Sequence, residues 1–194
     1  MQKLWTLDHY RIRRKFWALF GATFFIEGLD GEQLGYCRQK AFKLKEDIRI
    51  YTDATQSNEL MAIKARSIID FGASYDFYDA GTGEMIGGAK RKGLKSILRD
   101  SWILYNAEGH EIANLVEDSA GMAIIRRFMP FGGLIPQKFH IEMHGTAAHI
   151  TIHQAFNLLF YKLRVEIPPG HPIDKRMVTA ITILIAAIEG RQSS

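Results

Sequence analysis

An alternation of apolar and polar residues with a period of two recurs along most of the chain. In the segment 137–144, Phe139, Ile141 and Met143 alternate with polar residues, and this spacing places the apolar side chains on one face of a β-strand. Runs of this kind, separated by turn residues, predict strands. The predicted strands are Tyr10–Phe16, Thr23–Glu27, Gln33–Gln39, Ala41–Lys45, Asp47–Thr52, Leu60–Arg66, Ser74–Asp79, Glu84–Gly87, Trp102–Asn106, His110–Ala113, Gln137–His144, His149–Gln154 and Leu159–Ile167.

The segment Met177–Ile188 breaks this pattern, because all its residues except Thr179 and Thr182 are apolar. A helix with no polar face must be enclosed. Asp174 is suited to the N-cap and Gly190 to the C-terminal turn. A run of about 12 residues spans roughly 18 Å, less than the ~30 Å hydrocarbon core of a bilayer. The sequence therefore favours a helix buried inside protein over a short membrane anchor.

Hairpins with a common plan connect many of the strands. An aromatic strand leads into a glycine turn and then into a glutamate and aliphatic residues, as in the segments 24–35, 74–87 and 102–113. Repeated hairpins indicate an antiparallel meander. The segment Ser119–Phe131 is compatible with a strand and loop or with a short helix. We expect a single domain over residues 1–194: a closed antiparallel barrel of about 12 strands around the central hydrophobic C-terminal α-helix.

The charge and cysteine content bound the cellular setting. The formal net charge is +4, the sequence pI is about 9.2, and Cys37 is the one cysteine, so no intramolecular disulfide can form and a reducing compartment is favoured. The apolar run Phe16–Ile26 follows basic residues but lacks a signal-peptide cleavage site. The prediction is a cytoplasmic protein, peripheral to a membrane if it binds one.

The segment Ala65–Asp79, the repeated hairpins and the Ile/Ala-rich terminal helix resemble the tubby C-terminal-like superfamily. Within it, the chain is most similar to the LURP-one-related and phospholipid scramblase branch and its small bacterial members. The resemblance covers roughly residues 10–190 and implies a barrel of about twelve strands threaded by the C-terminal helix. The tubby branch implies phosphoinositide headgroup binding and the scramblase branch implies lipid movement and calcium. The LURP-one-related branch has no agreed activity, and no residue role is carried over.

Basic residues gather in three clusters, which are the predicted sites for an anionic headgroup. Lys and Arg side chains favour phosphates and anionic membrane surfaces. The alternative interpretations are plain solvated strand faces, balanced by the 21 acidic residues, or binding of nucleic acid or an acidic protein partner. The clusters comprise Arg11, Arg13 and Lys15; Lys90, Arg91 and Lys92; and Arg126 and Arg127.

Histidines form a second pattern. If residues 145–148 make a four-residue loop, His144 faces His149 and His140 faces His153, with Glu142 between them. Facing imidazoles about 5 Å apart can share Zn²⁺ or Ni²⁺. The alternatives are an ordinary polar strand face and a patch that responds to pH near 6.

Signatures of catalysis are missing from the sequence: there is no GxSxG, no Walker loop and no CxxC. Asp76, Asp79 and Glu84 flank one turn, but they lack the dense ligand spacing of an EF-hand, so calcium is disfavoured. The sequence thus predicts a non-enzymatic module that docks on anionic lipid or headgroups. The alternatives are a scramblase-like protein anchored by the C-terminal helix and a protein-interaction scaffold without a small ligand.

Overall fold

A computed structural model describes residues 2–15, 21–40, 47–67, 72–92, 101–118, 136–155 and 161–189. Its elements follow one another as strands, with a short 3-10 helix before them and an α-helix after them. They are η1 (Lys3–Thr6), β1 (His9–Lys15), β2 (Gly21–Glu27), β3 (Gln33–Lys40), β4 (Ile48–Tyr51), β5 (Glu59–Ser67), β6 (Ser74–Asp79), β7 (Met85–Arg91), β8 (Ser101–Tyr105), β9 (Glu111–Glu117), β10 (Lys138–Met143), β11 (Ile150–Ala155), β12 (Tyr161–Glu166) and α2 (Lys175–Glu189).

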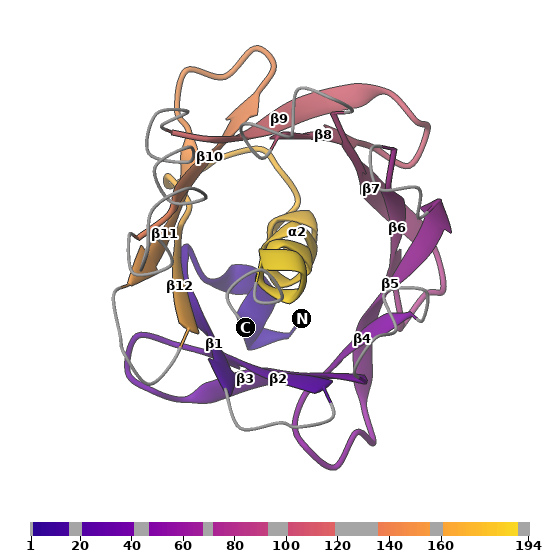
Figure 1. Cartoon of the computed structure of the whole chain (residues 1–194), viewed down its shortest axis with the longest axis vertical. Helices are drawn as coiled ribbons and strands as arrows, with labels where there is room; N and C mark the ends of the chain where they lie inside the picture. Colours follow the sequence, from indigo (N-terminus) through magenta and orange to yellow (C-terminus); the bar gives the residue numbers. More distant parts are fainter. Residues whose placement is uncertain are drawn as a thin grey trace, which may run out of the picture.

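The strands form a closed antiparallel barrel (Figure 1). Each strand pairs with the next in the chain, and β1 pairs with β12, with His9 opposite Glu166 and Arg14 opposite Tyr161. Closure leaves no strand edge unpaired, which explains how a meander this long avoids edge-to-edge aggregation. The predicted fold class is confirmed. The predicted strand Ala41–Lys45 and the segment Ser119–Phe131 lie outside the described residues.

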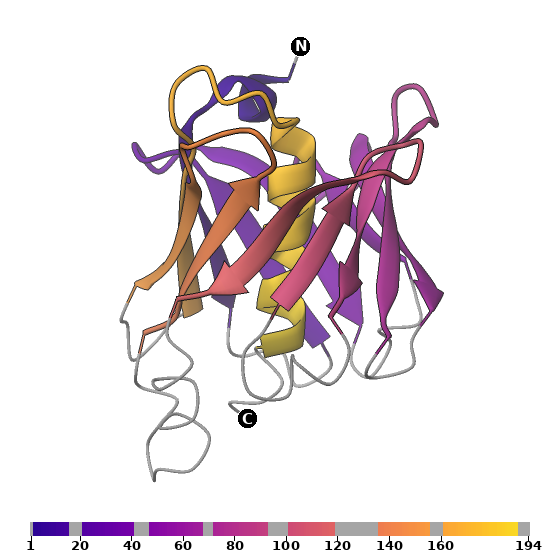
Figure 2. The same ribbon diagram turned by 90° about the horizontal axis from the view of Figure 1, so that it is seen from above.

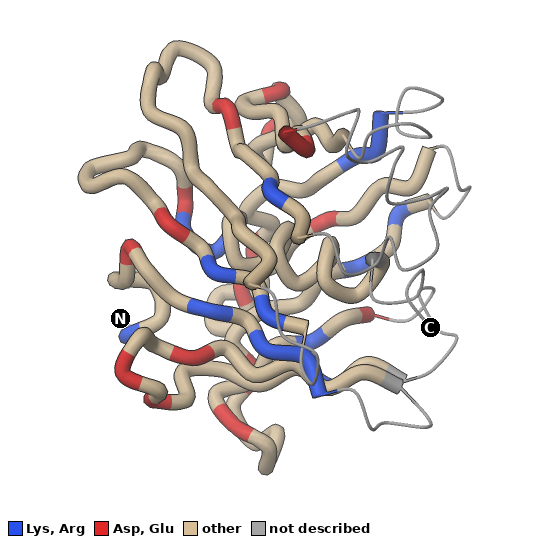
Figure 3. Tube along the Cα trace, turned by 60° about the vertical axis from the view of Figure 1, so that its left-hand side comes forward, with Lys and Arg blue, Asp and Glu red and all other residues tan. Residues whose placement is uncertain are grey.

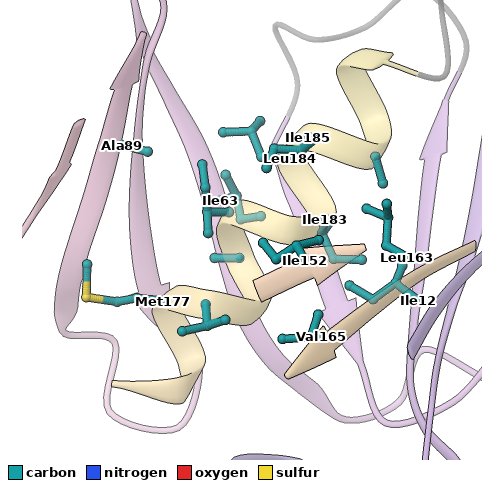
Figure 4. Close-up of a cluster of buried hydrophobic side chains, with 14 of the residues drawn as sticks. Ile12, Ile63, Ala89, Ile152, Leu163, Val165, Met177, Ile183, Leu184 and Ile185 are labelled. Carbon is teal, nitrogen blue, oxygen red and sulfur yellow. The ribbon is translucent and has the colours of Figure 1, made fainter. Parts of the chain in front are cut away.

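The α2 helix runs through the middle of the barrel (Figures 1 and 2). From Val178 to Ala187 no residue is more than 3% exposed, and its side chains pack against inward-facing residues such as Ile63 and Leu163 (Figure 4). The prediction of an enclosed helix is therefore confirmed. Within the described ranges, no helix is long and apolar enough to cross a membrane.

Polar contacts fix both the start and the middle of α2. The side chain of Asp174 accepts a hydrogen bond from the backbone N–H of Arg176 at 2.8 Å, which confirms the predicted N-cap; Gly190 lies outside the described residues. Inside the barrel, the Thr179 hydroxyl lies 2.9 Å from the Tyr10 hydroxyl, and the Thr182 hydroxyl donates to the Val178 carbonyl. Both threonines are thus satisfied in an apolar core.

The pairing of β10 with β11 differs from the predicted register. His140 lies opposite Thr151, and Lys138 lies opposite His153, so the predicted facing pairs His144–His149 and His140–His153 are wrong. The reason is that the hairpin ends asymmetrically: the last cross-strand pair is Ile141 with Ile150, while β10 continues to Met143 through its pairing with β9. The register is therefore shifted by two residues, which keeps the same faces inward.

Candidate anion-binding surfaces of the barrel

The predicted cluster on β1 faces outward, as its alternation requires. Tyr10 and Ile12 are buried inside the barrel, so Arg11 and Arg13 point to the outer wall. Arg13 donates to Glu27 through Nε at 2.9 Å and Nη2 at 2.7 Å, and its guanidinium lies 4.5 Å from the centroid of the Phe25 ring. Arg11 approaches the same Glu27 only to 3.6 Å. One carboxylate is therefore shared by two arginines.

The two described basic clusters end at the same rim of the barrel. Because neighbouring strands are antiparallel, β1 and β7 both end at the rim opposite the start of α2. Lys15 closes β1, and Lys90–Lys92 close β7 on a different side of the barrel (Figure 1). The structure thus brings these residues to one end, although not into one cluster. Arg126 and Arg127 lie outside the described residues.

Charge is polarised along the barrel axis. Figure 3 shows acidic residues gathered toward the end that carries the N-terminus and basic residues toward the other end. We call these ends the acidic rim and the basic rim. The acidic rim carries Asp8, Asp30, Glu32, Asp53, Asp79, Glu84, Glu108, Glu111 and Asp174; the basic rim carries Lys15, Arg38, Arg66, Lys90, Arg91, Lys92, Lys138 and Lys162.

The basic residues at the acidic rim form ion pairs with acids. The charged groups that remain unpaired at that rim are therefore mostly negative. Lys3 contacts Glu32, Lys175 lies 2.8 Å from Asp8, and Arg176 bridges Asp79 and Asp174 at 2.6 Å each. Acids also occur near the basic rim, where Asp118 lies 3.5 Å from Lys138. These ion pairs reduce the difference in charge between the two rims without removing it.

The histidines occupy the outer wall but do not form the predicted ladder. The Nε2 of His140 lies 2.5 Å from Oδ1 of Asp118, and the rings of His140 and His149 are 6.3 Å apart between centroids. His144 contacts Asn114 through Nε2 at 3.2 Å, and His153 lies opposite Lys138. Among the described residues, no group of three or more His, Cys, Asp or Glu is arranged to hold a metal ion. Glu142 is exposed on the same face.

The carboxylates considered for calcium are engaged by protein donors. Arg66 donates to Asp76 Oδ2 at 3.0 Å. Asp79 accepts from the backbone N–H groups of Gly81 and Thr82 and from Arg176. Burial raises the pKa of Asp79, but these hydrogen bonds outweigh it and leave the pKa below the ordinary value. Both side chains therefore act in turn and strand packing.

A tyrosine connects three strands on the wall formed by β6, β7 and β8, which we call the paired wall. The Tyr105 hydroxyl oxygen lies 2.8 Å from Asp76 Oδ1 and 2.9 Å from the Tyr75 carbonyl oxygen, so it can donate a hydrogen bond to either. To reach them it crosses Gly88, where an added Cβ would lie 2.3 Å from the Tyr105 oxygen. Burial, followed by the bond to Asp76, raises the pKa of Tyr105. Within this group the charge of Asp76 is paired, because Arg66 donates to the same carboxylate.

The basic residues of β12 were not among the predicted site residues. Arg164 lies directly opposite Arg11, and Lys162 lies directly opposite Arg13. Alternation within Tyr161–Glu166 already indicates that Lys162 and Arg164 share a face, but their position beside β1 depends on closure of the barrel.

One comparison with known proteins is informative. A family model described as LURP-one-related matches residues 34–186. No curated protein matches the chain, and no solved structure matches it.

Proposed function

The chain belongs to the LURP-one-related family, and we propose that it is a non-enzymatic binding module that docks on anionic membrane surfaces or phosphate-bearing headgroups through its basic rim. The observation that carries this proposal is the axial separation of charge between the two rims. On this proposal, the protein is peripheral to the cytoplasmic face of a membrane.

The basic rim has the chemistry that an anionic surface attracts. Lys15, Arg38 and Lys90 are exposed there, and each Lys or Arg near an anionic surface contributes on the order of 1 kcal/mol to attraction. The acidic rim is repelled by the same surface. Both effects orient the barrel end-on, with the start of α2 directed away from the lipid, so docking depends on the orientation of the molecule as well as on its net charge.

The alternative in which α2 anchors the protein in a bilayer conflicts with the position of the helix. Ile181, Ile183 and Leu184 are completely buried against the barrel wall, and the Tyr10–Thr179 contact ties α2 to β1. Exposing these side chains to lipid requires emptying the barrel core. The interaction-scaffold alternative leaves the basic rim without a lipid role.

Co-sedimentation with vesicles tests the proposal. The full chain is mixed with neutral phosphatidylcholine vesicles and with vesicles containing phosphatidylserine, at about 50 mM and about 500 mM salt. We expect binding to the anionic vesicles at low salt and release at high salt, because salt screens exposed charges. Absence of binding to anionic vesicles at low salt would contradict the proposal and favour a protein partner.

A matched pair of variants locates the contact. Lys90→Gln with Lys92→Gln removes two charges from the basic rim, whereas Lys3→Gln with Arg49→Gln removes two exposed charges elsewhere. The first variant should lose most of the vesicle binding and the second should retain it. Equal losses would show that net charge, and not the basic rim, governs binding.

A further inference from the structure

Barrel closure produces an unfavourable arrangement on the outer wall of β12 and β1. Arg164 lies opposite Arg11, and Lys162 lies opposite Arg13. The alternate residues Leu163 and Val165 are buried in the core, so all four basic side chains project outward. Like charges directly opposite one another on neighbouring strands destabilise a sheet. Two such pairs follow in succession along the same strand pair.

The arrangement continues across two further strands. Arg164 lies opposite His153 on β11, and His153 lies opposite Lys138 on β10. With neighbouring strands about 4.8 Å apart, the row spans roughly 14 Å. Figure 3 shows basic positions on successive neighbouring strands in this part of the wall. We call the row Lys138, His153, Arg164 and Arg11, with Lys162 and Arg13 beside it, the basic wall.

The described acids beside the basic wall pair with some of its members but not with Arg164. Glu27 accepts two hydrogen bonds from Arg13 and lies 3.6 Å from Arg11. Asp118 lies 2.5 Å from His140 and 3.5 Å from Lys138. In the part of the chain that the structure describes, Arg164 makes no hydrogen bond or ion pair, and the buried Nε of Arg11 has no hydrogen-bond partner. The guanidinium of Arg164, at the centre of the row, therefore has donors without an acceptor among the described residues.

We propose that the basic wall is a binding site for a phosphate-bearing ligand with at least two anionic groups, held between the guanidinium groups of Arg11 and Arg164 and extending toward His153 and Lys138. Each guanidinium presents several N–H donors in a planar fork, which suits phosphate oxygens. A bound polyphosphate group neutralises the opposed arginines and supplies the missing acceptors. This site is on the side of the barrel and meets the basic rim at Lys138 and Lys162, but its central residues, Arg11 and Arg164, lie outside that rim.

The position of His153 links binding to pH. Its pKa is lowered by burial, then by Lys138. His140 on β10 also lowers it, whereas Glu166 on β12 and Asp118, which directly follows β9, raise it; Arg164 faces it from β12. A bound phosphate adds negative charge beside the ring and raises the pKa of His153. Binding then takes up a proton, so affinity rises as the pH falls from about 8 toward about 6.

Calorimetric titration with inorganic tripolyphosphate tests this site on the full chain. The test variant is Arg11→Gln with Arg164→Gln, and the matched control is Lys3→Gln with Arg49→Gln, which removes two exposed charges outside both the basic rim and the basic wall. We expect the unmodified protein and the control to bind equally, and the test variant to lose at least about tenfold in affinity, the effect expected for losing charge-assisted hydrogen bonds. Equal binding by all three proteins, or no binding by the unmodified protein, would overturn the proposal.

Thermal unfolding separates a ligand site from a structural role. Tripolyphosphate should raise the Tm of the unmodified protein and leave that of the test variant unchanged. Without ligand, the test variant should melt at the same or a higher temperature, because opposed charges are removed. A lower Tm without ligand would assign these arginines to stability and contradict the proposal. Exposed Arg164→Gln alone serves as a second variant with less risk to folding.

Vesicle sedimentation distinguishes a soluble phosphate from a headgroup. If the ligand is soluble, the Arg11/Arg164 variant sediments with phosphatidylserine and phosphatidic acid vesicles as the unmodified protein does. If the ligand is a phosphomonoester headgroup, this variant loses binding to phosphatidic acid vesicles alone. Either result agrees with a ligand site at the basic wall, provided that calorimetry shows a loss of tripolyphosphate affinity in the Arg11/Arg164 variant. Loss of vesicle binding in the Lys90/Lys92 variant reports on the basic rim, so the two proposals succeed or fail separately.

Discussion

The paired wall over β6–β8 and the basic wall over β10–β12 and β1 belong to one barrel but solve the problem of surface charge differently. On the paired wall, Asp76 receives hydrogen bonds from Arg66 and Tyr105, and Gly88 leaves the space that Tyr105 needs. On the basic wall, Arg11 and Arg164 face each other, and the nearest carboxylate to Arg11, Glu27 at 3.6 Å, is already bonded to Arg13. Both walls enclose the same helix, and inward-facing residues of each, such as Phe77 and Leu163, are completely buried. The walls differ in how their outward charges are matched. On our proposal, the paired wall serves stability whereas the basic wall retains a cost to stability that binding can offset.

The largest expected effect comes from the core on which both walls rest. Leu184→Asp places a carboxylate at a position with 0% exposure and no described partner, so we expect a loss of more than about 4 kcal/mol and an unfolded or aggregated protein. Chemical denaturation followed by circular dichroism measures this. Leu184→Met, which conserves volume, should remain folded and is the control. A soluble Leu184→Asp protein with unchanged Tm would mean that α2 does not fill the barrel.

The next largest effect should be on the paired wall. In Gly88→Ala, the new Cβ would approach the Tyr105 hydroxyl to 2.3 Å and the Tyr75 carbonyl to 2.4 Å, so we expect a loss of about 2 kcal/mol in the free energy of unfolding. Combining it with Tyr105→Phe relieves only part of this loss, because the carbonyl is backbone. A fully additive pair of losses would show that the Gly88 and Tyr105 substitutions do not interact.

A smaller effect of opposite sign is expected on the basic wall. Arg164→Gln removes one member of an opposed pair and should raise the Tm by about 1–3 °C at low salt. The gain should shrink as added salt screens the repulsion in the unmodified protein. Differential scanning calorimetry at two ionic strengths measures both. A decrease in Tm at low salt would mean that Arg164 stabilises the folded protein, as the paired charges of the paired wall do.

The smallest effect concerns His153 and pH. The folded state lowers its pKa below the ordinary 6.5, so the unfolded chain binds the proton more readily. Stability from this residue is therefore fully present above pH 6.5 and is lost as the pH falls through the folded-state pKa. Unfolding free energies of His153→Gln should decline less between pH 7 and pH 5 than those of the unmodified protein. His171, whose pKa is also lowered by burial, retains part of the slope, and identical slopes would exclude a role for His153.

Local patterns in the sequence predicted the fold well, because strand alternation and an apolar helix leave few ways to bury the same surface. Met177–Ile188 predicts an enclosed helix by its composition alone, and Asp174 marks its start. The register of β10 and β11 was mispredicted, since it depends on which residues form the last cross-strand pair, here Ile141 and Ile150. The residues between them contain no Asn-Gly or Asp-Gly signal of a tight turn that would have fixed the register.

The basic wall was beyond local prediction for a different reason. Arg11 and Arg13 were recognisable as an outward-facing pair, and so were Lys162 and Arg164. Nothing in either strand indicates that they are neighbours, because the β1–β12 contact joins opposite ends of the sheet. Only the closure of the barrel makes them adjacent. The axial polarity likewise emerges once the strand directions are known.

The order of the elements also has a consequence for how the protein is made. The helix that fills the barrel leaves the ribosome after all the described strands, and β1 must wait for β12 before its outer edge is covered. The described strands of the meander are thus synthesised before their common core exists, and the contacts that complete this core join residues far apart in the sequence. Such topologies fold slowly. We therefore expect nascent chains of this protein to expose apolar strands until α2 has been synthesised, and to depend on chaperones during that interval.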